Sequence, residues 1–482
     1  MSNIQKKEQS NLDVALFALL LDHSHSASLQ AQLTEALRSL LLSGSDYSGT
    51  RLPASRVLAQ ELSVSRTTVV GAYDQLISEG YFKTMVGSGT FVAENLPHLV
   101  PPVQKSVAPP ETPQAWLPFH SGVPEQTLFP HRVWSRHVER AWARPSDGLL
   151  GRADPFGWYP LRQAISAHLK AWRKLDCQAE QIVITSGASE AFEIIFRGFL
   201  GPKQTAVVED PGWPLMRDVL DAVGTKVHLV RIDQHGLDAA RINHPGSAAI
   251  VTPSRHYPTG ISMPLSRRMA LLAWAERHDA LIVEDDYDSE FRYQGHPLPS
   301  LAGLDSLKRS IYLGSFSKLL SPALRIGYLV VPDSLLPSAQ RYMSRFGSRA
   351  SLIPQPALAS FMDSGAFAVH LRRMRRTYAK RQSHLISELA GCADLLDLSP
   401  DPSGMHICAA LRLKLQKTTT DKAITDAAFK EGLHLKALSS HSVLPDPPQG
   451  LVLGYAAFNE TELSQGAQKL SRLLGQFSNT LR

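Results

Sequence analysis

The stretch Gly314-Ser-Phe-Ser-Lys-Leu-Leu-Ser-Pro-Ala-Leu-Arg-Ile-Gly-Tyr328 determines much of what this chain can fold into and bind. Its small residues suit a tight turn from a strand into a loop. Such a turn would bring the Lys318 amine and the Arg325 guanidinium to one site. An amine can form a Schiff base with an aldehyde, and a guanidinium can hold a phosphate with two hydrogen bonds. The stretch therefore predicts a site for a phosphorylated aldehyde cofactor.

On both sides of this stretch, short apolar runs typical of buried strands alternate with helical patterns. This alternation indicates the α/β class, with a mostly parallel sheet and crossover helices. After about Pro337 the pattern becomes helical and then mixed, which predicts a smaller α+β domain closing over the sheet. The expected strands are Ile182–Thr185, Thr205–Val208, Ala248–Val251, Leu281–Val283, Ser310–Leu313 and Gly327–Val330.

A dense acidic cluster, Val283-Glu-Asp-Asp-Tyr-Asp-Ser-Glu-Phe291, follows one of these strands. So many carboxylates would be costly inside a core. They belong at the carboxyl end of the strand, where open α/β sheets bind ligands. A solvated strand end is the alternative interpretation, and Lys318 one strand later weighs against it.

The segment Thr185-Ser-Gly-Ala-Ser-Glu-Ala191 joins a strand to a helix through small residues. Free backbone N–H groups at the start of a helix can cradle an anion. An ordinary tight turn would have a similar sequence, so the segment by itself indicates a phosphate loop only weakly.

The N-terminal part predicts a separate helical unit from about Leu29 to Val92. Apolar residues at helical spacing, Val57 and Val70 among them, are expected to face its core. Two short strand-like pieces flank Gly87-Ser-Gly89, so the order predicts a helix-turn-helix with a β-wing. The expected elements are helices at 28–42, 52–62 and 66–80 and strands at 81–86 and 90–93.

Composition and segment boundaries limit the architecture further. A chain of 482 residues is too long for one core, and its net charge of +6 permits nucleic-acid binding without proving it. Repeated prolines make residues 95–118 a partly stiff linker between domains at 1–94 and 119–482. Three scattered cysteines have no metal-ligand spacing and fit a reducing cytosol. The apolar run 14–21 is too short for a membrane span and is interpreted as core.

The motifs together resemble known families. Residues from about Phe119 onward look like a fold-type I aminotransferase, and residues from about Leu29 to Val92 look like a GntR-type winged helix-turn-helix. The combination resembles the MocR subfamily of bacterial transcriptional regulators. The resemblance implies pyridoxal 5'-phosphate as cofactor, double-stranded DNA as partner, a homodimer and a cytoplasmic location.

The aminotransferase resemblance assigns roles to individual residues. It implies that Lys318 forms the Schiff base, Asp285 keeps the pyridine nitrogen protonated and Tyr287 donates to the phenolic oxygen. Asp286 and Asp288 would point elsewhere and be structural. Trp213 of Asp210-Pro-Gly-Trp-Pro214 would stack on the ring, although a packing tryptophan is the alternative. The phosphate would lie among Gly187, Ala188, Ser189, Ser315 and Arg325.

Three positions depart from the pattern of the resembling enzymes. Tyr257 stands where they have an asparagine before Pro-Thr-Gly, and regulatory relatives often carry an aromatic residue there. Arg152 stands where a tyrosine reaches across the dimer to the partner's phosphate. Val452 stands where an arginine holds the substrate carboxylate, which argues against transamination of ordinary α-amino acids.

The winged-helix resemblance predicts a DNA-reading surface at the start of the second and third helices and in the wing. Hydroxyls and arginines suit phosphates and the edges of bases. Tyr73 is either a phosphate contact or helix packing. The predicted DNA-binding residues are Ser55, Arg56, Ser65, Arg66, Thr67, Thr68, Tyr73, Gly89 and Thr90.

The sequence thus predicts a DNA-binding transcriptional regulator whose aminotransferase-like domain binds pyridoxal phosphate and senses an amine or amino-acid-like effector. Two alternatives remain: a catalytically active aminotransferase with an appended DNA-binding module, and a regulator that senses the cofactor itself.

Overall fold

The computed structural model describes Leu12, Leu16 and residues 21–22, 26–42, 47–85, 87–94, 116–145, 147–151, 154–201, 204–243, 246–296, 298–398 and 401–479. The chain divides into two compact units, Met1–Gln114 and Ala115–Arg482. Most of the predicted proline-rich linker, residues 95–115, lies outside the described residues. None of the described helices is both long and apolar enough to cross a membrane.

Between Leu29 and Val92 the described residues of the first unit form three helices and a two-stranded antiparallel wing, as expected from the sequence. The Ser65 hydroxyl caps the third helix by accepting a hydrogen bond from the Thr68 backbone N–H at 3.1 Å. Phe82 pairs with Val92 across the wing. The elements are α2 (Leu29–Leu42), α3 (Ser55–Glu61), α4 (Arg66–Ser78), β1 (Phe82–Met85) and β2 (Gly89–Val92).

This unit has a hydrophobic core of its own, built from one face of each helix and from the wing. Leu12 and Leu16 belong to that core, although most of the apolar run 14–21 lies outside the described residues. Two predictions are wrong: Val57 and Val70 are 49% and 37% exposed. Each lies next to a residue that takes the inward position, Leu58 and Val69, because one helical turn presents only one face to the core.

The second unit contains a seven-stranded sheet in the order β3-β9-β8-β7-β6-β4-β5. From β8 through β7, β6 and β4 to β5 the neighbouring strands are parallel, and β9 is antiparallel to both β8 and β3. The strands are β3 (Ile182–Thr185), β4 (Thr205–Asp210), β5 (Lys226–Arg231), β6 (Ala248–Val251), β7 (Leu281–Asp286), β8 (Ser310–Ser315) and β9 (Gly327–Val330).

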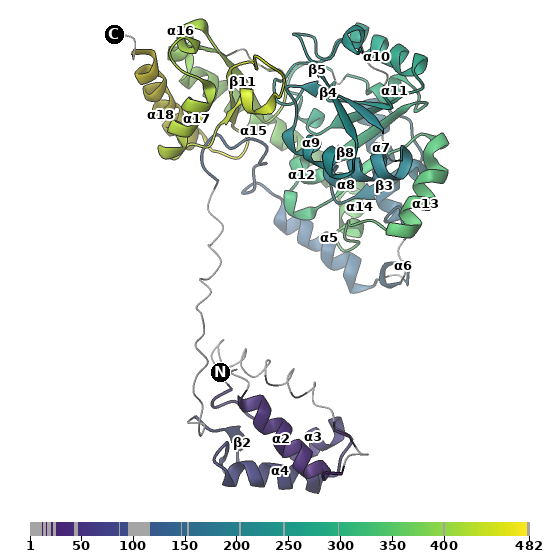
Figure 1. Ribbon diagram of the computed structural model, residues 1–482, viewed down its shortest axis with the longest axis vertical. Coiled ribbons are helices and arrows are strands. Elements are labelled where there is room, and N and C mark those ends of the chain that lie inside the picture. Colours follow the sequence, from purple (N-terminus) through teal and green to yellow (C-terminus); the bar gives the residue numbers. More distant parts are fainter. Residues whose placement is uncertain are drawn as a thin grey trace. The chain divides into compact units, whose positions relative to one another are not determined.

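Helices cover both faces of this sheet (Figure 1), which explains why its central strands are mostly apolar and buried. In β6, β8 and β9 nearly every residue is buried. The helices of this part are α5 (His131–Ala143), α6 (Asp147–Leu150), α7 (Tyr159–Arg173), α8 (Ala188–Glu193), α9 (Pro214–Ala222), α10 (Leu265–Arg277), α11 (Leu301–Leu304), α12 (Phe316–Leu319), α13 (Leu336–Phe346), α14 (Gln355–Asp363) and α15 (Ala366–Glu388).

The C-terminal part of this unit forms a second lobe, which contains β11 and is drawn in yellow-green in Figure 1. Its four antiparallel strands, in the order β10-β11-β13-β12, are called the C-terminal sheet below. The α+β character expected after Pro337 is confirmed. The elements are β10 (Leu396–Asp397), β11 (His406–Leu411), α16 (Leu413–Gln416), α17 (Asp421–Lys430), β12 (Lys436–Ala437), β13 (Gly450–Gly454) and α18 (Glu460–Asn479).

Candidate cofactor site and DNA-reading surface

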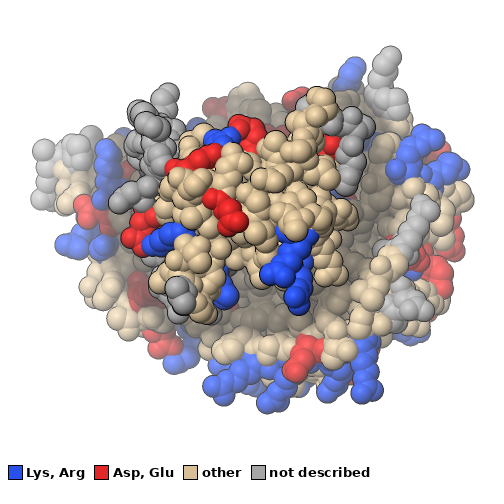
Figure 2. Space-filling view, turned by 90° about the horizontal axis from the view of Figure 1, so that it is seen from below, with Lys and Arg blue, Asp and Glu red and all other residues tan. Residues whose placement is uncertain are grey.

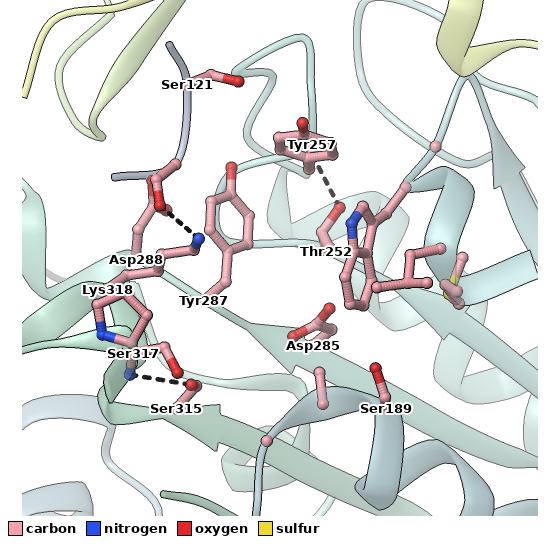
Figure 3. A pocket seen from close by; sticks show the side chains of 18 of the residues that line it. Ser121, Ser189, Thr252, Tyr257, Asp285, Tyr287, Asp288, Ser315, Ser317 and Lys318 are labelled. Carbon is pink, nitrogen blue, oxygen red and sulfur yellow. Dashed lines mark hydrogen bonds between the residues drawn. The ribbon is translucent and has the colours of Figure 1, made fainter. Parts of the chain in front are cut away.

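A cavity of about 360 Å³ lies at the carboxyl ends of the central parallel strands, where the topology of an open α/β sheet places ligand sites. Figure 3 shows Lys318, Tyr287 and Asp285 converging on this space. The cavity brings together all the predicted cofactor residues except Arg152, which lies outside the described residues. Its predicted lining residues are Gly187, Ala188, Ser189, Trp213, Tyr257, Asp285, Tyr287, Ser315, Lys318 and Arg325.

Lys318 lies in the short helix α12 that directly follows β8. Ser315 starts this helix and accepts a hydrogen bond from the Ser317 backbone N–H at 3.1 Å. The Lys318 amine donates to the carbonyl oxygen of Gly122. Burial, and then the charge of Lys436, lower the pKa of Lys318. A larger neutral fraction makes the amine a better nucleophile toward an aldehyde.

Gly122 reaches the lysine because it has no side chain. Its backbone φ is +79°, and a Cβ placed there would lie 3.0 Å from the Lys318 Nζ. Both the left-handed backbone and the close approach require glycine. This residue lies in the segment that enters the second unit and had no motif by which it could be predicted.

Asp285 is the next-to-last residue of β7 and lines the cavity. Burial is the main cause that raises its pKa to about 7, with Asp286 adding to the shift and Lys318 opposing it. Among the described residues Asp285 forms no ion pair. A protonated ring nitrogen would supply the counter-charge that this desolvated carboxyl group lacks. Asp285 therefore fits the cofactor that the sequence predicts.

The two neighbouring acids behave differently from each other. Asp286 faces away from the cavity, as predicted, and binds Arg173 at 2.8 Å and the Tyr312 hydroxyl at 2.6 Å. The expectation that Asp288 also points elsewhere is wrong. Asp288 lines the cavity and forms a buried ion pair with Arg255 at 3.3 Å. An irregular turn follows β7, so the alternation of a strand no longer holds at Asp288.

Two tyrosines place their rings beside this pair. The Tyr287 hydroxyl accepts a hydrogen bond from Arg255 at 3.0 Å, which leaves its own proton free to be donated. The Tyr257 hydroxyl lies 3.4 Å from the Nε2 of His441. The rings of the two tyrosines meet edge to face, with centroids 5.8 Å apart. Tyr257 thus fills part of the cavity wall.

Small and hydroxylated residues surround the opposite end of the cavity. Gly187 precedes α8 with a φ of +127°, and a Cβ added there would meet nothing within 4 Å. Ser189 and Arg325 are exposed, and Ser315 is half-buried. Arg325 adopts the left-handed region with a φ of 51°, which is uncommon for a residue with a side chain. Backbone N–H groups, hydroxyls and one guanidinium here suit a phosphate dianion.

Two further predicted residues have clear positions. Trp213 lines the cavity immediately before α9, with its ring centroid 6.4 Å from that of Phe192. Val452 is fully buried in β13 and does not line the cavity. The position at which the resembling enzymes carry arginine is therefore apolar and enclosed.

The predicted DNA-binding side chains gather around the start of α4. Ser65, Arg66 and Thr67 are exposed, and the Ser65 hydroxyl lies 2.7 Å from that of Thr67 and 2.8 Å from that of Thr68. Arg66 also donates to the Ser55 hydroxyl of α3 at 3.4 Å, which joins the two helices at this surface. Arg56 is exposed beside them.

Other members of the predicted set differ in exposure. Gly89 is exposed and Thr90 half-buried in the wing. Tyr73 is only 6% exposed, donates its hydroxyl proton to the Pro53 carbonyl at 3.0 Å and packs on Phe82. Its prediction as a DNA contact is therefore corrected to helix packing, the alternative that the sequence left open.

Sequence reasoning missed residues that only the fold brings to these sites. Arg51 lies beside the wing, its Nε 3.3 Å from a Cβ built on Gly89. Ser121, His406 and Lys436 line the cavity from the entering segment and the C-terminal sheet. None of them belongs to a local motif. On the face shown in Figure 2, Lys and Arg side chains are interspersed with Asp and Glu, so charge does not mark a site there either.

Comparison with known proteins gives two family matches. Residues 123–470 match class I and II aminotransferases, and residues 29–92 match the gntR family of bacterial regulatory proteins. The chain is 36% identical to the probable rhizopine catabolism regulatory protein MocR of Rhizobium meliloti, over 94% of this chain and 95% of the relative. It is also 36% identical to the HTH-type pyridoxine biosynthesis transcriptional regulator PdxR of Corynebacterium glutamicum, over 92% and 96%.

Solved structures share the fold of the second unit. A kynurenine aminotransferase of Pyrococcus horikoshii aligns with a TM-score of 0.67 at 22% identity, covering 76% of this chain and 92% of that one. The α-aminoadipate aminotransferase LysN of Thermus thermophilus aligns with a TM-score of 0.67 at 23% identity, covering 75% and 92%. At this identity the likeness establishes the fold.

Proposed function

Because this chain belongs to the MocR subfamily of GntR-type transcriptional regulators, we propose that ligand binding in the cavity around Lys318 controls how it binds an operator. The chain is a DNA-binding transcriptional regulator whose aminotransferase-like domain binds pyridoxal phosphate. The proposal concerns what the domain senses, which is an amine or amino-acid-like effector or the cofactor itself.

The observation that carries this proposal is the convergence of Lys318, Asp285 and Arg325 on one cavity. When bound, pyridoxal phosphate supplies an aldehyde and an electron-accepting ring. Lys318 offers the amine, Asp285 the counter-charge for a ring nitrogen and Tyr287 a hydroxyl proton. The phosphate would be held by Arg325 with residues 187–189 and Ser315, and Trp213 would stack on the ring.

Sensing is favoured over turnover by the environment of Val452. The side chain is fully buried in β13, so no guanidinium occupies the position that holds the substrate carboxylate in the resembling enzymes. A working aminotransferase remains the second candidate, favoured by the complete set of Lys318, Asp285 and Tyr287. Release of a keto acid from an amino donor at steady state would distinguish it.

We also propose that the chain acts as a homodimer in the cytoplasm. A dimer matches the expectation that Arg152 serves a phosphate across a subunit interface. Two DNA-reading units would then bind two half-sites of an operator. Sedimentation of the purified protein at micromolar concentration directly tests whether it is a dimer.

The decisive experiment follows absorbance and operator binding in the same titration. The operator is first located by footprinting the promoter regions next to the gene. Cofactor, and then candidate amines, are added to the purified protein. We expect the visible spectrum and the footprint to change at the same ligand concentrations, since a ligand that binds one state better must shift the equilibrium toward it. A footprint unchanged by both ligands would contradict regulation through this cavity.

A further inference from the structure

Three residues form a row across the C-terminal sheet, and Lys436 at one end of the row lines the cofactor cavity. Cys408 of β11 and Lys436 of β12 are both direct partners of Val452 in β13. Residues directly opposite each other in antiparallel strands project from the same face of the sheet. Because Lys436 lines the cavity, the row is on the cavity side. The resembling enzymes carry a cationic arginine at the position of Val452. In this chain the cation is Lys436, on the neighbouring strand β12.

Lys436 is half-buried, and none of the described carboxylates forms an ion pair with it. Burial lowers the pKa of its ammonium group. No hydrogen bond joins its amine to another described residue, although its backbone pairs with Val452 in the sheet. Burial chiefly, and the charge of Lys436 in addition, lower the pKa values of nearby imidazoles and of a second amine: His120, Lys318, His406, His434 and His441.

The carboxyl groups of the cavity do not supply the missing charge. Asp288 is paired with Arg255, and Asp285 stands near the end of β7, where it is placed for a ring nitrogen. Glu190 and Glu209, which also line the cavity, accept hydrogen bonds from backbone N–H groups. A desolvated cation without a partner is unfavourable. The cavity therefore carries a charge that an anionic ligand would complete.

A polar group beside the residue that hydrogen-bonds the Lys318 amine lacks a hydrogen-bond partner as well. The Ser121 hydroxyl is buried and has no hydrogen-bond partner of good geometry among the described residues, although the Tyr257 hydroxyl lies near it. Ser121 directly precedes Gly122, whose carbonyl accepts a hydrogen bond from the Lys318 amine. A ligand reacting at Lys318 would thus find both a hydroxyl donor and the charge of Lys436 in the same cavity.

We propose that Lys436 determines ligand specificity in this cavity and that the ligand is a primary amine bearing an acidic group. The amine would react where Lys318 holds the cofactor, and Lys436 would bind the acid in place of an arginine at position 452. This inference rests on the proposed function, because it assigns the chemistry of the sensed ligand. An ammonium is a compact charge with rotatable donors, so it accepts carboxylate, sulfonate or phosphonate groups.

The test uses reduced cofactor adducts, which bind without any reaction. N-(5'-phosphopyridoxyl) derivatives of L-alanine and β-alanine are each paired with an alkylamine derivative in which an isopropyl group replaces the carboxylate. Kd values are measured by calorimetry with the cofactor-free full-length protein. Lys436→Met removes the charge at similar volume, and Lys436→Arg keeps it.

We expect the wild type to bind at least one acidic adduct about tenfold or more tightly than its isostere. Lys436→Met should reduce this preference to about threefold or less while the neutral adducts keep their Kd. Lys436→Arg should retain most of it. Equal binding of both members of each pair by the wild type, or full preference in Lys436→Met, would overturn the proposal. An equal loss of affinity for the acidic and the neutral adducts in Lys436→Met would also overturn the proposal.

The adduct experiment is independent of DNA. If the preference depends on Lys436 but operator affinity ignores every ligand, the specificity assignment stands and the proposed regulation fails. If operator affinity responds to ligands but the preference for acidic adducts is absent, the proposed regulation stands and the specificity assignment fails.

Discussion

Asp285, the next-to-last residue of β7, carries a carboxyl group whose pKa is raised to about 7, mainly by burial. The unfolded value is about 3.9. A raised acid pKa contributes stability that is fully present below about pH 4 and is lost as the pH rises through about 7. The cofactor-free protein should therefore lose stability across this window. The loss from this group is at most about 4 kcal/mol.

Asp285→Asn should flatten this dependence, because the amide does not ionise. Thermal midpoints of both cofactor-free proteins, measured from about pH 4 to about pH 8, cover the window in which the stability contribution changes. Glu209 and Asp288 also have pKa values of about 7, so the wild type alone does not isolate Asp285. The contribution of Asp285 is given by the difference in thermal midpoint between the wild type and Asp285→Asn. If the two proteins showed parallel plots of midpoint against pH, the raised pKa would not belong to Asp285.

Lys318→Ala should abolish covalent attachment of pyridoxal phosphate. The purified wild type is expected to be yellow and to be trapped by borohydride, whereas the variant binds the cofactor only through its phosphate and ring contacts. Lys308→Ala, at an exposed lysine just before β8, is the matched control and should behave like the wild type. Absorbance and mass after reduction report the result. A modified peptide at any other lysine would refute the prediction.

At the scale of elements, α3 and α4 present two exposed arginines at one surface. Arg56→Ala and Arg66→Ala should each weaken operator binding by roughly 1–3 kcal/mol if the arginine contacts a base. If it contacts a phosphate, mainly the salt dependence should fall. The visible spectrum should not change, since the two units have separate cores. Arg277→Ala at the end of α10 is the charge-matched control, and equal operator affinity in all variants would exclude this surface.

Ser65 combines two functions that one pair of substitutions can separate. Its hydroxyl caps α4, and it lies in the predicted DNA-reading surface. Ser65→Ala should destabilise the first unit by about 1 kcal/mol through loss of the cap. Ser65→Asp keeps a capping oxygen but places a negative charge where phosphates approach, so it should keep thermal stability and lose operator affinity. An unimpaired Ser65→Asp would place the DNA elsewhere.

The elements differ in how far the sequence could predict them. β3, β6 and β9 are continuous apolar runs between helices and have the predicted bounds. β5 was missed because Lys226–Arg231 is an edge strand, paired only with β4 and half-exposed, so its sequence lacks an apolar run. Lys318 and Asp285 could be predicted from motifs. Lys436 could not, because its position depends on pairing with β13, which no local pattern contains.

For the whole molecule, the two units each have a core and are joined through a proline-rich sequence. The operator half-sites that a dimer can span should therefore depend on the length of residues 95–115. Inserting roughly ten Gly and Ser residues there should preserve the visible spectrum and binding to a single half-site. Binding to paired half-sites should tolerate a wider range of spacings. Selection of operators with variable spacers measures this, and an unchanged spacing preference would contradict it.

The hydrogen bond from Lys318 to Gly122 sets a limit on signalling through the entering segment. Gly122 lies a few residues after Pro118, whose carbonyl accepts from His434, and Trp116 packs on His120. An amine committed to a cofactor can no longer donate to Gly122 as a free ammonium does. A hydrogen bond from a charged group is worth about 1.5–3 kcal/mol. If attachment of the cofactor to Lys318 acts on the DNA-binding unit only through the loss of this hydrogen bond, it can change operator affinity by a factor of about 10 to 150 and no more.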